Sequence, residues 1–187
     1  MYCGENPIAI QSQKWLVEAL VSLMNEMPYQ KISVLNICKK ADLSRQTFYN
    51  FFETKEDILR FCLRSCYEKL FTDLSAQQII SLKDAVDAFM LVLEENRELL
   101  GKMIENGLEG LITEEIARCI DLFANRFSLR GKEDHMLVYG EAFLSGALAR
   151  VMLCWFQQKE PVSAQELTDM LLLIFQGEYF EIQVSKR

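Results

Sequence analysis

Glycine and proline are scarce in the first half of this chain of 187 residues. Only Gly4 precedes Gly101, and the three prolines are Pro7, Pro28 and Pro161. Because these two residue types interrupt regular structure and form turns, their spacing favours long helices over many short strands. Half of the residues are hydrophobic, which is enough for a core in a chain of this length. The sequence therefore predicts an all-α protein.

Apolar residues recur at helical spacing in about nine segments. The second segment, which Ser33 can cap, contains Ile32, Val34 and Leu35. These residues also suit a strand, but the helical spacing of Val34, Ile37, Cys38 and Ala41 and the pair Lys39–Lys40 decide for a helix. We expect helices over about 8–27, then a short one after Ser33, one after Ser44 and a longer one from Thr54, followed by 82–96, 97–107, 111–128, 134–157 and 163–182.

Charge is distributed unevenly along the chain, whose net charge is −7. Residues 1–60 hold seven basic and seven acidic residues, whereas residues 61–187 hold thirteen and twenty. Residues 31–55 contain five basic and two acidic residues. A local positive patch on an acidic protein can bind a polyanion, so this patch favours nucleic acid as a partner.

The segment SRQTFYNFFETK, residues 44–55, combines an apolar and a polar face. At helical spacing its three phenylalanines cluster on one side, and most of its donors lie opposite. Arg can bond guanine, Gln and Asn can bond adenine, Thr can contact the thymine methyl group, and Tyr or Lys suits phosphate. This pattern predicts the second helix of a helix-turn-helix. The residues expected to contact DNA are Ser33, Ser44, Arg45, Gln46, Thr47, Tyr49, Asn50 and Lys55.

The run KISVLNICKKADLSRQTFYNFFETKEDIL, residues 31–59, resembles the DNA-binding domain of the TetR/AcrR family of transcriptional regulators. Two positions depart from the family pattern. Asp42 stands where the turn usually has glycine, and an aspartate can adopt the left-handed conformation. Phe51 replaces the usual histidine, so a phosphate contact common in the family is missing. The resemblance implies a helix-turn-helix domain over residues 1–53 and a helical effector-binding and dimerisation domain over residues 54–187.

The resemblance also implies a homodimer, a palindromic double-stranded operator, a repressor role and a small-molecule effector. Apolar residues in the C-terminal half are candidates for the effector pocket: Phe89, Met90, Leu93, Met103, Ile104, Leu108, Phe123, Phe143 and Trp155. Apolar residues of the last two helices are candidates for the dimer interface: Leu144, Leu148, Val151, Met152, Leu167, Met170, Leu171 and Ile174.

Other functional classes lack the residues they require. Six cysteines and one histidine occur without metal-ligand spacing, so we expect no metal, no cofactor and no enzyme activity. The N-terminus lacks the pattern of a signal peptide, and a cytoplasmic protein without a membrane span is expected. Two alternatives stay open, namely control by a protein partner and control by thiol oxidation. A closed apolar cavity of several hundred Å³ favours a ligand, and a filled core favours the partner.

Overall fold

The computed structural model describes residues 7–75, 81–126 and 134–180. Those residues form nine α-helices, two short 3-10 helices and no β-strand, which confirms the predicted all-α class. The α-helices are α1 (Pro7–Glu26), α2 (Val34–Ala41), α3 (Arg45–Phe51), α4 (Lys55–Ser75), α5 (Leu82–Glu95), α6 (Arg97–Glu105), α7 (Glu109–Arg126), α8 (Leu137–Gln157) and α9 (Ala164–Gln176). The 3-10 helices are η1 (Tyr29–Lys31) and η2 (Asp134–Met136).

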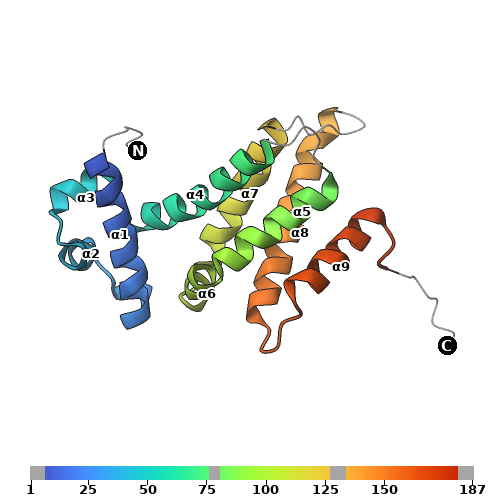
Figure 1. Ribbon diagram of the computed structural model, residues 1–187. Coiled ribbons are helices and arrows are strands. Elements are labelled where there is room, and N and C mark those ends of the chain that lie inside the picture. Colours follow the sequence, from blue (N-terminus) through green and yellow to red (C-terminus); the bar gives the residue numbers. More distant parts are fainter. Residues whose placement is uncertain (1–6, 76–80, 127–133, 181–187) are drawn as a thin grey trace.

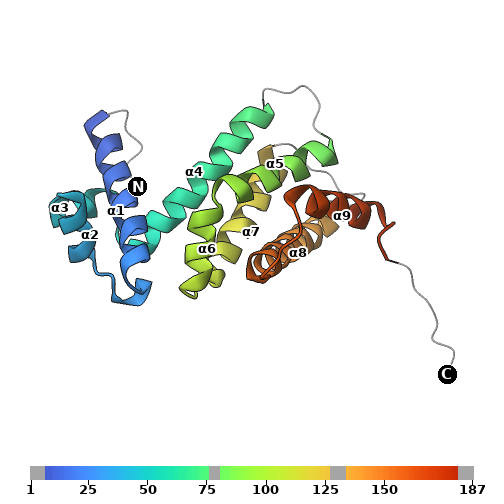
Figure 2. The ribbon, with the colours of Figure 1, turned by 60° about the horizontal axis from the view of Figure 1, so that its bottom comes forward.

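Helices α1, α2 and α3 form a group at one end of the molecule, and α4 runs from this group to the remaining helices (Figures 1 and 2). In both views α9 lies farthest from α1–α3. The predicted domain boundary at residue 53 falls in the turn between α3 and α4. The division into two domains stays a prediction, because α4 packs against both groups of helices.

Side-chain caps fix several helix starts where the sequence predicts them. The Ser33 hydroxyl accepts the Asn36 amide at 3.2 Å, and Asn36 Oδ1 accepts the Ser33 amide at 2.9 Å. This reciprocal capping box starts α2 and settles residues 33–41 as helix rather than strand. Capping boxes also form at Thr54 and Ser163, through Asp57 and Glu166 respectively.

The last helix is shorter than predicted. It ends at Gln176 because Gly177 adopts a left-handed conformation, with φ 78°. The amide of Gly177 donates to Ile174 O at 3.0 Å, and the amide of Glu178 donates to Leu173 O at 2.9 Å. This hydrogen-bond pattern stops a helix, and glycine adopts it without the steric cost of a Cβ atom.

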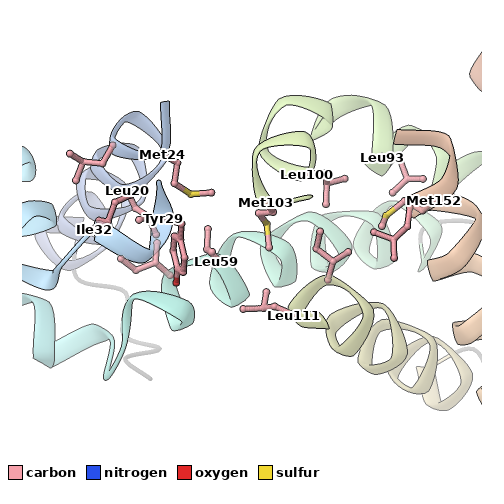
Figure 3. Close-up of a cluster of buried hydrophobic side chains, with 14 of the residues drawn as sticks. Leu20, Met24, Tyr29, Ile32, Leu59, Leu93, Leu100, Met103, Leu111 and Met152 are labelled. Carbon is pink, nitrogen blue, oxygen red and sulfur yellow. The ribbon is translucent and has the colours of Figure 1, made fainter. Parts of the chain in front are cut away.

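The hydrophobic core continues from the first three helices into the rest of the molecule. Figure 3 shows Tyr29 of η1, Leu59 of α4 and Met103 of α6 along one line of buried side chains. Their exposed fractions are 3%, 0% and 0%. Burying a large apolar side chain contributes about 1.5–3 kcal/mol, so this continuous packing holds α1–α3 against α4 and α6.

Candidate nucleic-acid interface

Helix α3 begins at a serine cap in the turn after α2. The Ser44 hydroxyl accepts the Thr47 amide at 3.0 Å and lies 2.8 Å from the Thr47 hydroxyl. This cap satisfies one of the amides that a helix start leaves without a partner. At the other end, Phe52 is extended and terminates the helix after seven residues.

The apolar side of α3 is anchored by aromatic rings, as predicted. Phe48 and Phe52 are buried, with exposed fractions of 0% and 2%. Their ring centres lie 6.0 Å apart, and the ring of Phe52 lies 5.8 Å from that of Phe61 on α4. Phe51, which stands where the family has histidine, is half-buried with its ring 6.4 Å from Phe52. These contacts fix the rotation of α3 about its axis.

The opposite side of α3 presents polar side chains to solvent. Arg45, Gln46, Tyr49 and Asn50 are all exposed, whereas Thr47 at the border is half-buried. The Arg45 guanidinium lies 5.9 Å from the centre of the Tyr49 ring. The structure thus brings together the donors expected to read base edges on one face, and their contact with DNA stays a prediction.

The turn between α2 and α3 depends on Asp42. It has φ 52° and ψ 43°, the left-handed conformation, and it is the non-glycine residue with positive φ among those described. The following amide, of Leu43, donates to Cys38 O at 3.0 Å. The expectation that an aspartate replaces the usual glycine in this conformation is confirmed.

Lys55 is placed differently from its prediction. Its ammonium donates to Tyr29 O at 2.7 Å and to Ile32 O at 2.9 Å, and lies 4.0 Å from the centre of the Tyr29 ring. Two of its three donors are therefore used inside the protein, so its position does not fit a phosphate contact. The start of α4 packs against η1, which is a long-range contact that local sequence pattern does not show.

Comparison with known proteins identifies this arrangement. The profile of the family described as bacterial regulatory proteins, tetR family, matches residues 16–61, which span most of α1, all of α2 and α3, and the start of α4. The chain carries the DNA-binding domain of the TetR family. Its first three helices are the helix-turn-helix part of that domain.

Other proteins are similar to part of this sequence or to its fold. Over 67 residues the chain is 36% identical to the HTH-type dhaKLM operon transcriptional activator DhaS of Lactococcus lactis subsp. lactis (strain IL1403), and the match covers 36% of each chain. The fold resembles that of Lin0861 from Listeria innocua, with TM-score 0.72 and 16% identity over 95% of this chain and 96% of that one. It also resembles a TetR transcriptional regulator from Streptococcus agalactiae 2603V, with TM-score 0.61 and 18% identity over 89% and 94%.

The C-terminal helices enclose two adjoining apolar hollows. One, of about 140 Å³, lies between α4, α5, α7, α8 and α9, and the other, of about 60 Å³, lies between α4, α5, α6, α7 and α8. Both are lined by Leu70, Phe89 and Cys119. Neither volume reaches the several hundred Å³ that would alone favour a ligand over a partner. A groove of about 430 Å³ on the surface between α1 and α2 lies outside this region.

The predicted pocket residues divide into three groups. Phe89, Leu93 and Phe123 line the hollows as expected. Phe143 is 65% exposed, so it cannot line an interior cavity of one protomer. The remaining predicted residues line neither of these two hollows and pack in or against the core: Met90, Met103, Ile104, Leu108 and Trp155. Apolar periodicity predicts that a residue faces inward, but it does not distinguish a residue that lines a cavity from one that fills the core.

Four of the predicted dimer residues face the interior of their own protomer. Leu148, Met152, Leu167 and Leu171 are at most 8% exposed, so they cannot form a surface for a second copy. The half-buried residues of the prediction, which can still reach such a surface, are Leu144, Val151, Met170 and Ile174. The apolar side chains that α8 and the residue before it do expose are Met136, Val138, Tyr139 and Phe143.

Helix α8 is also long and apolar enough to cross a membrane, by length and composition alone. Of its most apolar window, 22% is buried inside the protomer. A helix that packs in a protein core or interface meets the same criteria, so this is weak support for a span. The exposed apolar side chains of α8 form a patch of the kind that marks an interaction surface.

The five described cysteines are free thiols, of which Cys154 is exposed and the others are buried or half-buried. Burial raises the pKa of the Cys62 and Cys119 thiols to about 12, and burial also raises the pKa of Cys66. Because the thiolate is the form that reacts with oxidants, these shifts argue against control by thiol oxidation at these three residues. Cys3 lies outside the described residues.

An ion cluster that the sequence did not reveal joins α4 to α7. The carboxylate of Glu115, which is 2% exposed, accepts Arg60 Nη1 at 3.0 Å, Arg64 Nε at 3.2 Å and Arg64 Nη2 at 3.3 Å. Burial acts to raise the pKa of Glu115, but the hydrogen bonds from Arg64 and Arg60 outweigh it and hold the pKa below its usual range. The i, i+4 spacing of the two arginines indicates that they share one face of α4. Their partner could not be predicted, because it lies 51 or more residues away in the sequence.

Proposed function

We propose that this protein is a TetR-family repressor that binds a palindromic operator as a homodimer and is released by an effector. The observation that carries the proposal is the exposed face of α3, where Arg45, Gln46, Tyr49 and Asn50 are held by the buried Phe48 and Phe52. A helix fixed on one side with donors on the other is what major-groove readout requires.

The dimer part of the proposal is supported by the exposed apolar side of α8. Tyr139 and Phe143 are 67% and 65% exposed, and they lie four residues apart, so they share one face of the helix. Pairing of two such faces also suits a palindromic operator, since paired recognition helices must reach major-groove faces about 34–36 Å apart.

The oligomeric state can be measured directly by sedimentation. A dimer is expected for the wild-type protein, and Phe143→Glu is expected to shift it to monomer because it places a charge in the pairing surface. Leu91→Glu is the matched control, since Leu91 is 53% exposed on a different helix, α5. A wild-type monomer at micromolar concentration contradicts this part of the proposal.

The effector part rests on the hollow of about 140 Å³, which contacts α4, α5, α7, α8 and α9 at once. A molecule that fills it and prefers one arrangement of these helices changes the separation of the two recognition helices. Because the lining is apolar, the expected effector is a small apolar compound. A thermal-shift screen of such compounds, repeated with Ala85→Trp to fill the hollow, tests this expectation.

Operator binding is tested by selecting DNA from a random pool and comparing it with the DNA upstream of the gene. Enrichment of an inverted repeat supports the proposal, and enrichment of no sequence contradicts it. A promoter–reporter fusion then gives the sign of regulation, because a repressor lowers expression by occluding the promoter.

An activator is the second candidate function. The observation that favours it is the similarity to DhaS, a transcriptional activator, over 67 residues. In the same reporter experiment, activation raises expression when the regulator is present.

A further inference from the structure

One side chain of α6 bonds the backbone that follows α1. Asn106 caps the C-terminus of α6, and its Oδ1 accepts the Tyr29 amide at 2.8 Å. The Asn106 carbonyl accepts Gln30 Nε2 at 2.9 Å. The two partners are 76 and 77 positions apart in sequence, so these bonds join the helix-turn-helix part to the C-terminal helices.

The Asn106 carboxamide is held in a fixed orientation before it meets Tyr29. Its Nδ2 donates to Lys102 O at 2.8 Å, within the last turn of α6. A carboxamide has one acceptor and one donor group, and here both are matched in one orientation. Tyr29 is only 3% exposed, so water does not readily replace Asn106 as the partner of its amide.

Tyr29 is held from a second direction by the start of α4. Lys55 Nζ donates to the Tyr29 carbonyl at 2.7 Å, so one residue of η1 binds α6 through its amide and α4 through its carbonyl. In Figure 3, Leu59 of α4 lies between Tyr29 and Met103 of α6. The bond to Asn106 therefore adds direction to an apolar contact that by itself has none.

The other end of α6 borders the cavity region. Asn96 and Leu100 line the hollow of about 60 Å³. The Arg97 guanidinium lies 4.2 Å from the centre of the Trp155 ring on α8. Nine residues of helix rise only about 13 Å, so a shift at Asn96 moves Asn106 with it as one short rigid unit.

We propose that Asn106 is a positioning residue that sets the orientation of the helix-turn-helix part relative to the C-terminal helices, and that changes at the cavity reach α3 through it. The regulatory half of this inference rests on the proposed function. The structural half, that Asn106 holds Tyr29, does not.

The test compares amide hydrogen exchange at Tyr29 in the full-length wild-type protein and two variants. Asn106→Ala removes the acceptor of the Tyr29 amide. Asn125→Ala is the matched control, because Asn125 Nδ2 makes the same bond to the carbonyl four residues earlier, Asp121 O at 2.8 Å, near the end of α7 and away from η1. A neutral hydrogen bond corresponds to a factor of about 2–10 in an equilibrium.

We expect Tyr29 to exchange about 2–10 times faster in Asn106→Ala, and at the wild-type rate in Asn125→Ala. Affinity for the selected DNA is expected to fall by a similar factor in Asn106→Ala alone, with an unchanged far-ultraviolet circular dichroism spectrum. Unchanged exchange at Tyr29 in Asn106→Ala overturns the proposal. Faster exchange with DNA affinity equal to that of Asn125→Ala overturns its regulatory half. If the wild-type protein binds no DNA, the proposed function fails, and the exchange rates still decide whether Asn106 holds Tyr29.

Discussion

The ammonium of Lys55 lies 4.0 Å from the centre of the Tyr29 ring and donates to the Tyr29 carbonyl at 2.7 Å. This pair joins the first turn of α4 to the segment after α1. It also removes Lys55 from the set of side chains that are free to meet a phosphate.

Replacing Lys55 by methionine is therefore expected to act on stability rather than on DNA charge contacts. Lys55→Met loses two hydrogen bonds and a cation–π contact, and we expect the free energy of unfolding to fall by about 1–3 kcal/mol. Lys39→Met, at an exposed lysine of α2, should change it by less than about 0.5 kcal/mol. Urea denaturation measures both. A Lys55→Met protein as stable as Lys39→Met would show that the contact contributes nothing.

The Glu115 cluster predicts a second stability effect. Glu115→Gln leaves Arg60 and Arg64 beside a neutral amide, and we expect a loss of about 1–3 kcal/mol in the free energy of unfolding. The matched control is Glu114→Gln, because Glu114 also bonds Arg60, at 2.8 Å, but its side chain is 63% exposed. An exposed pair contributes about 0–1 kcal/mol. Equal losses in the two variants would contradict the role assigned to burial.

The same carboxylate predicts a pH dependence. The pKa of Glu115 is lowered in the folded protein, chiefly because the arginine hydrogen bonds outweigh burial. A group with a lowered pKa stabilises the fold above its unfolded pKa, about 4.3 for Glu, and this contribution is lost as pH falls through the folded pKa. The stability difference between wild type and Glu115→Gln should therefore be constant near neutral pH and shrink below about pH 4. A stability difference that grows as the pH falls would contradict a lowered pKa of Glu115 in the folded protein.

Asp42 tests the cost of the left-handed turn. Its φ of 52° is strained for residues with a Cβ atom, though less for Asp than for most. We expect Asp42→Gly to raise the free energy of unfolding by about 0.5–1 kcal/mol and Asp42→Ala to lower it by about 1 kcal/mol. Thermal unfolding of the three proteins gives the order. If Ala equals Gly in stability, backbone strain at this turn is not the controlling factor.

The cap of α3 gives a fifth expectation. Ser44→Ala removes the acceptor of the Thr47 amide, which typically costs about 1 kcal/mol. Ser65→Ala is the control, because Ser65 lies inside α4 and its hydroxyl donates to Phe61 O at 2.9 Å without capping a helix. Only Ser44→Ala should also weaken DNA binding, since it loosens the start of the recognition helix. Similar effects of the two substitutions on DNA binding would count against the cap.

Local chemistry explains why much of the fold could be predicted from the sequence. The serine caps at residues 33, 44 and 163 act within three residues, so pattern alone locates these helix starts. The two faces of α3 follow from helical spacing in the same way, with Phe48 buried and Tyr49 half exposed. The end of α9 was missed, because Gly177 lies inside an apolar run that continues the helical spacing.

Long-range partners explain the parts that sequence did not reveal. In the sequence Asn106 is an ordinary residue at a helix end, and only the structure shows that it accepts the Tyr29 amide. In the same way, the sequence does not distinguish Glu115 from a surface carboxylate, and only the structure shows its bonds to Arg60 and Arg64 of α4. Helix α8 is apolar on most sides, so periodicity could not tell that Leu148 faces the protomer core while Phe143 faces outward.

The most direct test of the central claim is DNA binding by wild type and Arg45→Ala across a salt series. The account predicts tight, sequence-selective binding by the wild-type dimer to selected or upstream DNA. Arg45→Ala should lose about 1–3 kcal/mol of selectivity at one position of each half-site, which is the signature of base readout. Lys55→Met should leave the salt dependence unchanged. Binding that is weak, indifferent to sequence and equally salt-sensitive in wild type and Arg45→Ala would contradict the assignment of α3 as a recognition helix.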